Sequence, residues 1–173
     1  TMYRLGYEEL SGNQKTWANL SEQEISLINS SIDNLYVTGS GSYIPHVPKW
    51  PLPSIGIEHL SGINLRIEEI NWLNSKLNNN SHKNELFSYL VDIGCILRPG
   101  FKYGCRWRVY DDDVSNSHAP WLLEPYNEAP ESWEKLCLAV RLAEGVHKKW
   151  VCGFHNNDGW EFLNIKRWLP GKV

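Results

Sequence analysis

The last forty residues contain the pattern that most constrains the fold: an amphipathic helix followed by two strands. Residues 130–149 predict the helix, because apolar residues recur at a period of 3.6, Glu131 and Glu134 lie in the first turn, and basic residues lie at the end. Residues 150–154 and 160–168 predict strands, and the Asn-Asp-Gly turn between them is typical of a hairpin. This order indicates a small α/β domain.

The sequence before this helix extends the same domain. Residues 84–94 predict an amphipathic helix that ends at a glycine, and residues 95–104 predict a strand and a turn. Residues 105–110 alternate like a strand, and residues 119–125 predict another short strand. We therefore expect a chain of the α+β class whose second domain, residues 84–173, contains a mixed sheet.

The first 80 residues are expected to form a small N-terminal domain of mixed α/β structure. Residues 20–32 predict a helix, with Ser21 as its N-cap and Glu24 completing the capping box. A polar run near residue 80 is the expected linker between the two domains.

Two further segments of this half are assigned from composition. Residues 39–56 are rich in Gly, Ser and Pro, so we expect loop and extended chain there. Residues 57–77 predict a second helical region, which Gly62 weakens.

Composition limits the classes of function. Hydrophobic residues make up 42% and charged residues 21% of the 173 residues, which is a globular balance. The net charge of −3 disfavours a protein that coats nucleic acid without specificity, but residues 81–173 hold 12 of the 17 Lys and Arg residues. A local basic cleft could therefore bind RNA. The start of the chain does not resemble a signal peptide and no apolar run is long enough to span a membrane, so we expect a cytoplasmic protein without a membrane partner.

The four cysteines show no zinc-binding spacing. They stand at positions 95, 105, 137 and 152, and none forms a CxxC pair. We expect buried free thiols and no metal site.

Four segments of the second half resemble, in order, motifs of one enzyme family. They are ELFSYLVDIGCILRPGFKYG (85–104), CRWRVY (105–110), SHAPWLL (117–123) and RLAEGVHKKW (141–150), followed by HNNDGWEFLNIKRW (155–168). This series resembles the archaeal tRNA-splicing endonuclease (tRNA intron endonuclease) family. The resemblance covers residues 84–173, about half of the chain.

The resemblance implies a catalytic triad. By its position in the motifs, Tyr110 would be the general base, His118 the general acid and Lys148 the group that stabilises charge on the phosphorus. A histidine suits the acid role because its ordinary pKa of about 6.5 allows it to donate a proton near neutrality. The implied activity is that of a tRNA-intron lyase, which leaves 2',3'-cyclic phosphate and 5'-hydroxyl ends. No metal and no cofactor is implied.

The resemblance also implies binding surfaces. Arg141 would stack on a flipped-out base, and it stands seven residues before Lys148, which on one helix would place both on the same face. Arg167 and Lys166 are further candidates for RNA contact.

Assembly and substrate follow from the same resemblance. Asp158 and Glu161 would form an acidic turn that docks into another subunit, and the last strand would pair with another subunit's edge. The expected substrate is precursor tRNA with a bulge-helix-bulge. Two cuts at a fixed spacing imply a homotetramer or a dimer of heterodimers with a second endonuclease subunit.

Two other interpretations remain open from the sequence. The chain could be a noncatalytic structural subunit of the same enzyme, or a module that binds RNA or protein without cutting. In the second case Tyr110, His118 and Lys148 would lie apart in space. The run Asp111 to Asp113 is expected to be a solvated loop rather than a metal site.

Overall fold

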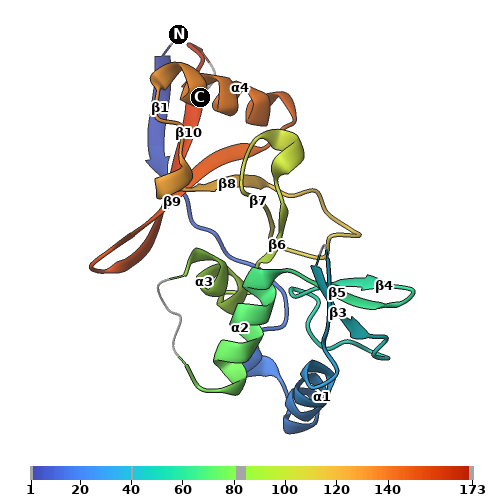
Figure 1. Cartoon of the computed structure of the whole chain (residues 1–173). Coiled ribbons are helices and arrows are strands. Elements are labelled where there is room, and N and C mark those ends of the chain that lie inside the picture. Colours follow the sequence, from blue (N-terminus) through green and yellow to red (C-terminus); the bar gives the residue numbers. More distant parts are fainter. Residues whose placement is uncertain (1, 40, 81–84, 172–173) are drawn as a thin grey trace. The chain divides into compact units, whose positions relative to one another are not determined.

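The computed structural model describes residues 2–39, 41–80 and 85–171 (Figure 1). Contacts group the chain into two compact units: one lies between Asn13 and Ile96, and the other combines the segment up to Gly12 with the segment from Leu97 onward. The expected domains, 1–80 and 84–173, stay a prediction. The contact-based units differ from them in two ways: the first strand pairs with the last, and residues 85–96, which the sequence places in the second domain, group with the unit that begins at Asn13.

The terminal unit is built on a six-stranded sheet in the order β1-β10-β9-β8-β7-β6. Its strands are β1 (Met2–Tyr7), β6 (Ile96–Pro99), β7 (Trp107–Tyr110), β8 (Trp121–Pro125), β9 (Lys149–Asn156) and β10 (Gly159–Trp168). The strands β8 and β9 are parallel, while β1–β10, β10–β9 and β7–β8 are antiparallel. Parallel neighbours need a crossover connection, which the helix α4 (Trp133–Gly145) provides. The expected α+β class with a mixed sheet is confirmed.

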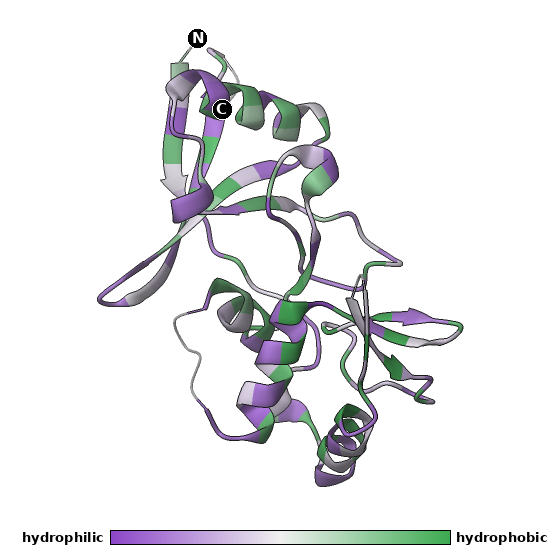
Figure 2. Cartoon of the chain, viewed as in Figure 1, coloured by the Kyte–Doolittle hydropathy of each residue, from purple (hydrophilic) through white to green (hydrophobic). Residues whose placement is uncertain are grey.

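The helix α4 packs its apolar side against this sheet. Ser132 is the N-cap, and its hydroxyl accepts a hydrogen bond from the Lys135 N–H at 3.3 Å. Val140 and Ala143 are fully buried and join a core cluster with Leu122 of β8. Hydrophobic and hydrophilic segments both appear along α4 in Figure 2, as expected of an amphipathic helix.

The helix ends earlier than the sequence predicts. Instead of continuing to Lys149, α4 stops at Gly145, and His147 takes a positive φ of 56° that turns the chain. The Lys148 N–H then donates to the Ala143 carbonyl at 2.9 Å. Because Lys148 lies beyond the helix, the prediction that it shares a helix face with Arg141 is wrong.

The strand β1 was not predicted. It pairs along its whole length with β10, from Met2 opposite Trp168 to Tyr7 opposite Leu163. The expectation that this edge of the last strand is open to another subunit is therefore wrong, because the chain's own first strand covers it (Figure 1). Tyr3 fixes β1 against the start of α4, with its ring centroid 5.2 Å from that of Trp133.

The unit between Asn13 and Ile96 contains three helices and a four-stranded sheet in the order β2-β3-β5-β4 among its described residues. They are α1 (Glu22–Ile32), α2 (Ile67–Leu77), α3 (Leu86–Asp92), β2 (Tyr36–Thr38), β3 (Gly41–Pro45), β4 (Ile57–His59) and β5 (Gly62–Leu65). Short 3-10 turns complete the chain: η1 (Trp17–Asn19), η2 (Phe101–Tyr103) and η3 (Tyr126–Glu128). In the described ranges, no helix is long and apolar enough to cross a membrane.

The capping box predicted for α1 is confirmed. The Glu24 N–H donates to the Ser21 hydroxyl oxygen at 3.3 Å, and the Ser21 N–H donates to the Glu24 carboxylate at 2.9 Å. The two bonds satisfy donors that a helix N-terminus otherwise leaves open.

The helical prediction for residues 57–77 is wrong in its first part, and the loop prediction for residues 39–56 misses β3. Strands β4 and β5 form a hairpin before α2 begins at Ile67. Gly62 explains the difference, since its φ is +152° and an added Cβ would lie 2.1 Å from the Ile44 carbonyl oxygen. Only glycine allows this close approach of β5 to β3.

Candidate active site

The sheet topology brings the three predicted catalytic residues to one edge. Tyr110 is the last residue of β7, His118 stands three residues before β8, and Lys148 directly precedes β9. Val109 and Lys149 are both register partners of the same residue, Trp121. The end of β7 and the starts of β8 and β9 therefore meet at one place.

Hydrogen bonds join the segments that carry His118 and Lys148. The Lys149 N–H donates to the Pro120 carbonyl at 2.9 Å. The Lys148 ammonium donates to the Ala119 carbonyl at 2.7 Å. The side chain of Lys148 is thus held against the residue that follows His118.

Two residues that the sequence analysis did not select complete this cluster. The guanidinium carbon of Arg108 lies 5.8 Å from the Tyr110 ring centroid, and the Arg108 Nε donates to the Pro99 carbonyl at 2.9 Å. The Lys148 ammonium lies 5.8 Å from the ring centroid of Tyr103. Burial lowers the pKa of Lys148, and the positive charge of Arg108 lowers it further. The available signal for Arg108 was its position two residues before Tyr110, on the same face of the strand.

Exposure differs among the three residues. Tyr110 is 4% exposed, Lys148 is partly buried and His118 is exposed. The same end of the sheet therefore carries a buried phenol, an ammonium group that is hydrogen-bonded to a carbonyl, and an exposed imidazole.

The acidic run before His118 contains a turn former. The carboxylate of Asp113 accepts hydrogen bonds from the Ser115 N–H at 2.7 Å and the Ser115 hydroxyl at 2.6 Å, and these bonds lower its pKa. The Asp113 carbonyl also accepts from the Ser117 N–H at 3.0 Å. Asp113 therefore shapes the loop that leads to His118. Within the described ranges, no group of three or more His, Cys, Asp or Glu side chains is arranged to hold a metal ion.

Lys149 has a different environment from its neighbour Lys148. Its ammonium lies 2.5 Å from the Glu8 carboxylate, which also accepts from the side chains of Trp121 and Asn164, each at 3.0 Å. Burial of Glu8 acts to raise its pKa, but these three bonds outweigh it and the pKa is lowered. The two adjacent lysines therefore have separate partners: Lys148 donates to the Ala119 carbonyl, and Lys149 pairs with the Glu8 carboxylate.

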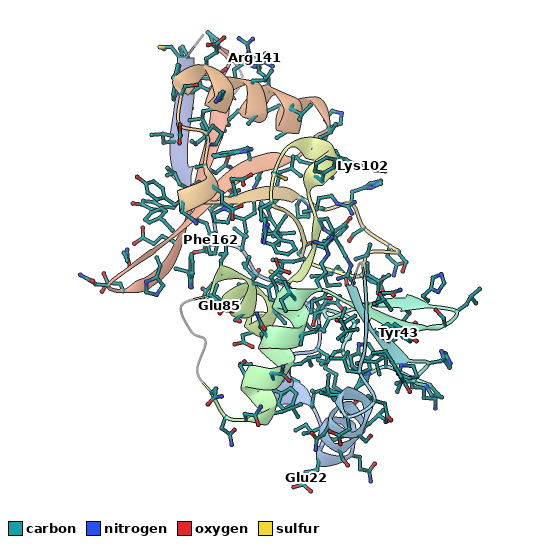
Figure 3. All side chains as sticks on the ribbon, in the orientation of Figure 1. Glu22, Tyr43, Glu85, Lys102, Arg141 and Phe162 are labelled. Carbon is teal, nitrogen blue, oxygen red and sulfur yellow. The ribbon has the colours of Figure 1, made fainter. Side chains whose placement is uncertain are left out.

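The residues expected to contact RNA or another subunit fall in several places. Arg141 is exposed on α4 (Figure 3). Arg167 is held by Glu144, whose carboxylate accepts from the Arg167 backbone N–H at 2.7 Å and lies 3.2 Å from the Nε of its side chain. Asp158 is exposed in the β9–β10 turn, and the Glu161 carboxylate accepts from the amide of Asn156 in the same hairpin. Lys166 is exposed on β10. Their roles in RNA binding and docking stay predictions.

All four cysteines are free, and three are buried as expected. The exception is Cys137, which is half-buried. Burial raises the pKa of Cys105 to about 12 and that of Cys152 to about 11. Thiolate nucleophiles are therefore disfavoured at these two positions.

Comparisons with known proteins identify a family for the segment that carries these residues. Residues 81–160 match the family described as tRNA intron endonuclease, catalytic C-terminal domain. The chain belongs to the tRNA intron endonuclease family. The matched segment contains the three residues of the sheet edge, while β1 and most of β10 lie outside it.

Relatives come from archaea and from fission yeast. A tRNA-splicing endonuclease of Picrophilus torridus is 31% identical over 130 residues, which are 74% of this chain and 42% of the relative. That of Thermoplasma volcanium is 39% identical over 67 residues, 39% of this chain and 22% of the relative. The probable tRNA-splicing endonuclease subunit sen34 of Schizosaccharomyces pombe is 31% identical over 98 residues, 48% of this chain and 34% of the relative. The chain thus spans less than half the length of these curated relatives.

Proposed function

We propose that the chain is a catalytic subunit that cuts precursor tRNA at its splice sites. The observation that carries the proposal is the meeting of Tyr110, His118 and Lys148 at one edge of the mixed sheet. A structural subunit would not need these three groups together. A binding module unrelated to cleavage would leave them apart.

The proposed reaction uses the RNA's own 2'-hydroxyl as the nucleophile. Tyr110 acts as the base in its deprotonated form: it takes the proton from this hydroxyl, and the 2'-oxygen forms a bond to the adjacent phosphorus. The bond from phosphorus to the 5'-oxygen breaks, and His118 donates a proton to that oxygen. The products are a 2',3'-cyclic phosphate and a 5'-hydroxyl, so protons and bonds balance without a metal ion.

Lys148 would stabilise the negative charge that develops on the phosphoryl oxygens. Its hydrogen bond to the Ala119 carbonyl fixes the ammonium group before substrate binds. Such preorganisation avoids the reorganisation of a mobile side chain during the reaction.

The proposed substrate is a bulge-helix-bulge, because unstacked nucleotides in bulges can reach the in-line geometry that internal attack requires. Two cuts at a fixed spacing call for two active sites in a symmetric assembly. The fission yeast relative is itself described as a subunit, which supports an assembly of several chains.

The test is cleavage of a bulge-helix-bulge RNA in EDTA, with analysis of the product ends. Cuts at both bulges with cyclic phosphate and 5'-hydroxyl ends are expected. Hydrolytic ends, such as a 5'-phosphate, would contradict the mechanism. If cleavage requires a second subunit, full activity of the complex containing His118→Ala would show that this chain is structural.

A further inference from the structure

A row of cations crosses the terminal sheet from its first strand to the candidate active site. Arg4 of β1 pairs with Lys166 of β10. The next strand begins at Lys149, and Ile165 pairs with Trp150, so Lys166 and Lys149 are neighbours across β10 and β9. Lys148 directly precedes Lys149 in the sequence and is the fourth cation of this group.

These four cations line one cavity of about 530 Å³. Its floor and walls come from β1, β9, β10 and the end of α4. Ligand sites in proteins commonly have volumes of about 300 to 1,000 Å³. We name this cavity the β1 pocket, and it contains the candidate catalytic lysine in its wall.

The β1 pocket carries a surplus of positive charge. Its two carboxylates already have cationic partners: Glu8 lies 2.5 Å from the Lys149 ammonium, and Glu144 lies 3.2 Å from the Nε of Arg167. Arg4 and Lys166 are both exposed, and neither forms an ion pair with any described part of the chain.

Arg4 is nevertheless held in place. Its guanidinium carbon lies 5.4 Å from the ring centroid of Trp168. The face of an aromatic ring attracts a cation, so this contact orients the guanidinium without neutralising it. An oriented guanidinium offers the paired donors that suit a phosphate group.

We propose that the β1 pocket binds a backbone phosphate of the RNA that neighbours the phosphate being cut, with Arg4 and Lys166 as its ligands. This proposal rests on the proposed function, and it assigns a role to β1, which the family match does not cover. Arg4 and Lys166 would act as positioning residues, because phosphate contacts fix the register of a nucleic acid on a protein.

The test measures RNA affinity separately from chemistry. The probe is a bulge-helix-bulge RNA with 2'-deoxy nucleotides at both cleavage positions, so that it binds without being cut. Its Kd is measured over a series of salt concentrations for the wild type, Arg4→Gln and Lys166→Gln. Lys135→Gln is the matched control, because Lys135 is an exposed cation on α4.

Each pocket variant is expected to weaken binding by about tenfold and to reduce the slope of log Kd against log salt by about 1. Arg4→Lys should recover most of the affinity. With cleavable RNA at saturation, the cleavage rate of the pocket variants should stay within about threefold of the wild type, and Lys135→Gln should change neither quantity.

The outcomes separate the two proposals. If the wild type binds and cuts RNA but the pocket variants keep its Kd and salt slope, the pocket assignment alone is overturned. A pocket variant with normal Kd but a large loss of rate at saturation would also overturn it. If the wild type binds no RNA, either alone or in complex with a second subunit, the proposed function fails and the pocket assignment fails with it.

Discussion

Glu124 provides the sharpest test of the packing in the terminal unit. It lies in β8 opposite Cys152 and is 8% exposed. Its carboxylate accepts a hydrogen bond from the Arg106 N–H at 3.1 Å. Burial raises the pKa of Glu124 from its ordinary 4.5 to about 7, although the bond from Arg106 opposes the rise, and the nearby Glu128 adds to it.

This raised pKa makes stability fall as pH rises. Below pH 4.5 the Glu124 carboxyl is protonated in both the folded and the unfolded state, so its ionisation does not change the free energy of unfolding. Between pH 4.5 and 7 the unfolded chain releases the proton while the folded chain retains it, so the free energy of unfolding decreases. The difference between the two pKa values corresponds to a loss of about 3 kcal/mol, complete above pH 7.

The variant Glu124→Gln removes the ionisation and keeps an acceptor for the Arg106 N–H. At pH 8 it should be more stable than the wild type by up to about 3 kcal/mol, and this advantage should vanish below pH 4.5. Urea unfolding between pH 4 and pH 8 measures both curves. Glu9→Gln, at an exposed carboxylate, is the control and should follow the wild type. Parallel curves for Glu124→Gln and the wild type would refute the reasoning.

Three further perturbations test other parts of the structure. Gly62→Ala should lower the free energy of unfolding by about 2 kcal/mol or more, because its Cβ would meet a backbone carbonyl of β3 at 2.1 Å; an unchanged urea midpoint would contradict this. Glu8→Gln should cost about 1 kcal/mol at pH 7 through loss of its pair with Lys149. Because the pKa of Glu8 is lowered, that cost should disappear as the pH falls through this pKa, and a constant difference would count against it. In the folded protein at pH 8, iodoacetamide should modify Cys137 well before Cys105, whose pKa is about 12; equal rates measured by mass spectrometry would contradict its burial.

The sequence was most informative where local signals are strong. Ser21 with Glu24 marks the start of α1, and the Asn-Asp-Gly turn marks the β9–β10 hairpin. These features depend on residues within a few positions of one another. The parallel pairing of β8 and β9, by contrast, depends on how α4 crosses the sheet.

Structure that depends on contacts between distant segments could not be predicted from the sequence. Residues 2–7 form the strand β1 because they pair with β10, which lies about 160 residues later in the chain, and no local sequence pattern predicts such a pairing. The pattern of residues 57–77 predicts a helical region because short apolar runs fit both the helical and the strand periodicity. The end of α4 was misplaced because His147 adopts a positive φ, which is uncommon for residues other than glycine.

The candidate site was predicted only as three motifs. Their residues span positions 110 to 148, and spacing alone does not place them together. Trp121 joins them in the structure, since it is the register partner of both Val109 and Lys149. Arg108 was missed because its relation to Lys148 exists only in the folded sheet.

The central claim is that Tyr110, His118 and Lys148 act together on one phosphate. The most direct test is the single-turnover rate of bulge-helix-bulge cleavage for Tyr110→Phe, His118→Ala, Lys148→Ala and the triple variant, with His155→Ala as an exposed control. Each single variant should lose at least about 100-fold, and the triple variant little more than the most damaged single one, because groups that act as a unit are not additive. Rates near that of the wild type, or small losses that simply multiply in the triple variant, would contradict a shared active site.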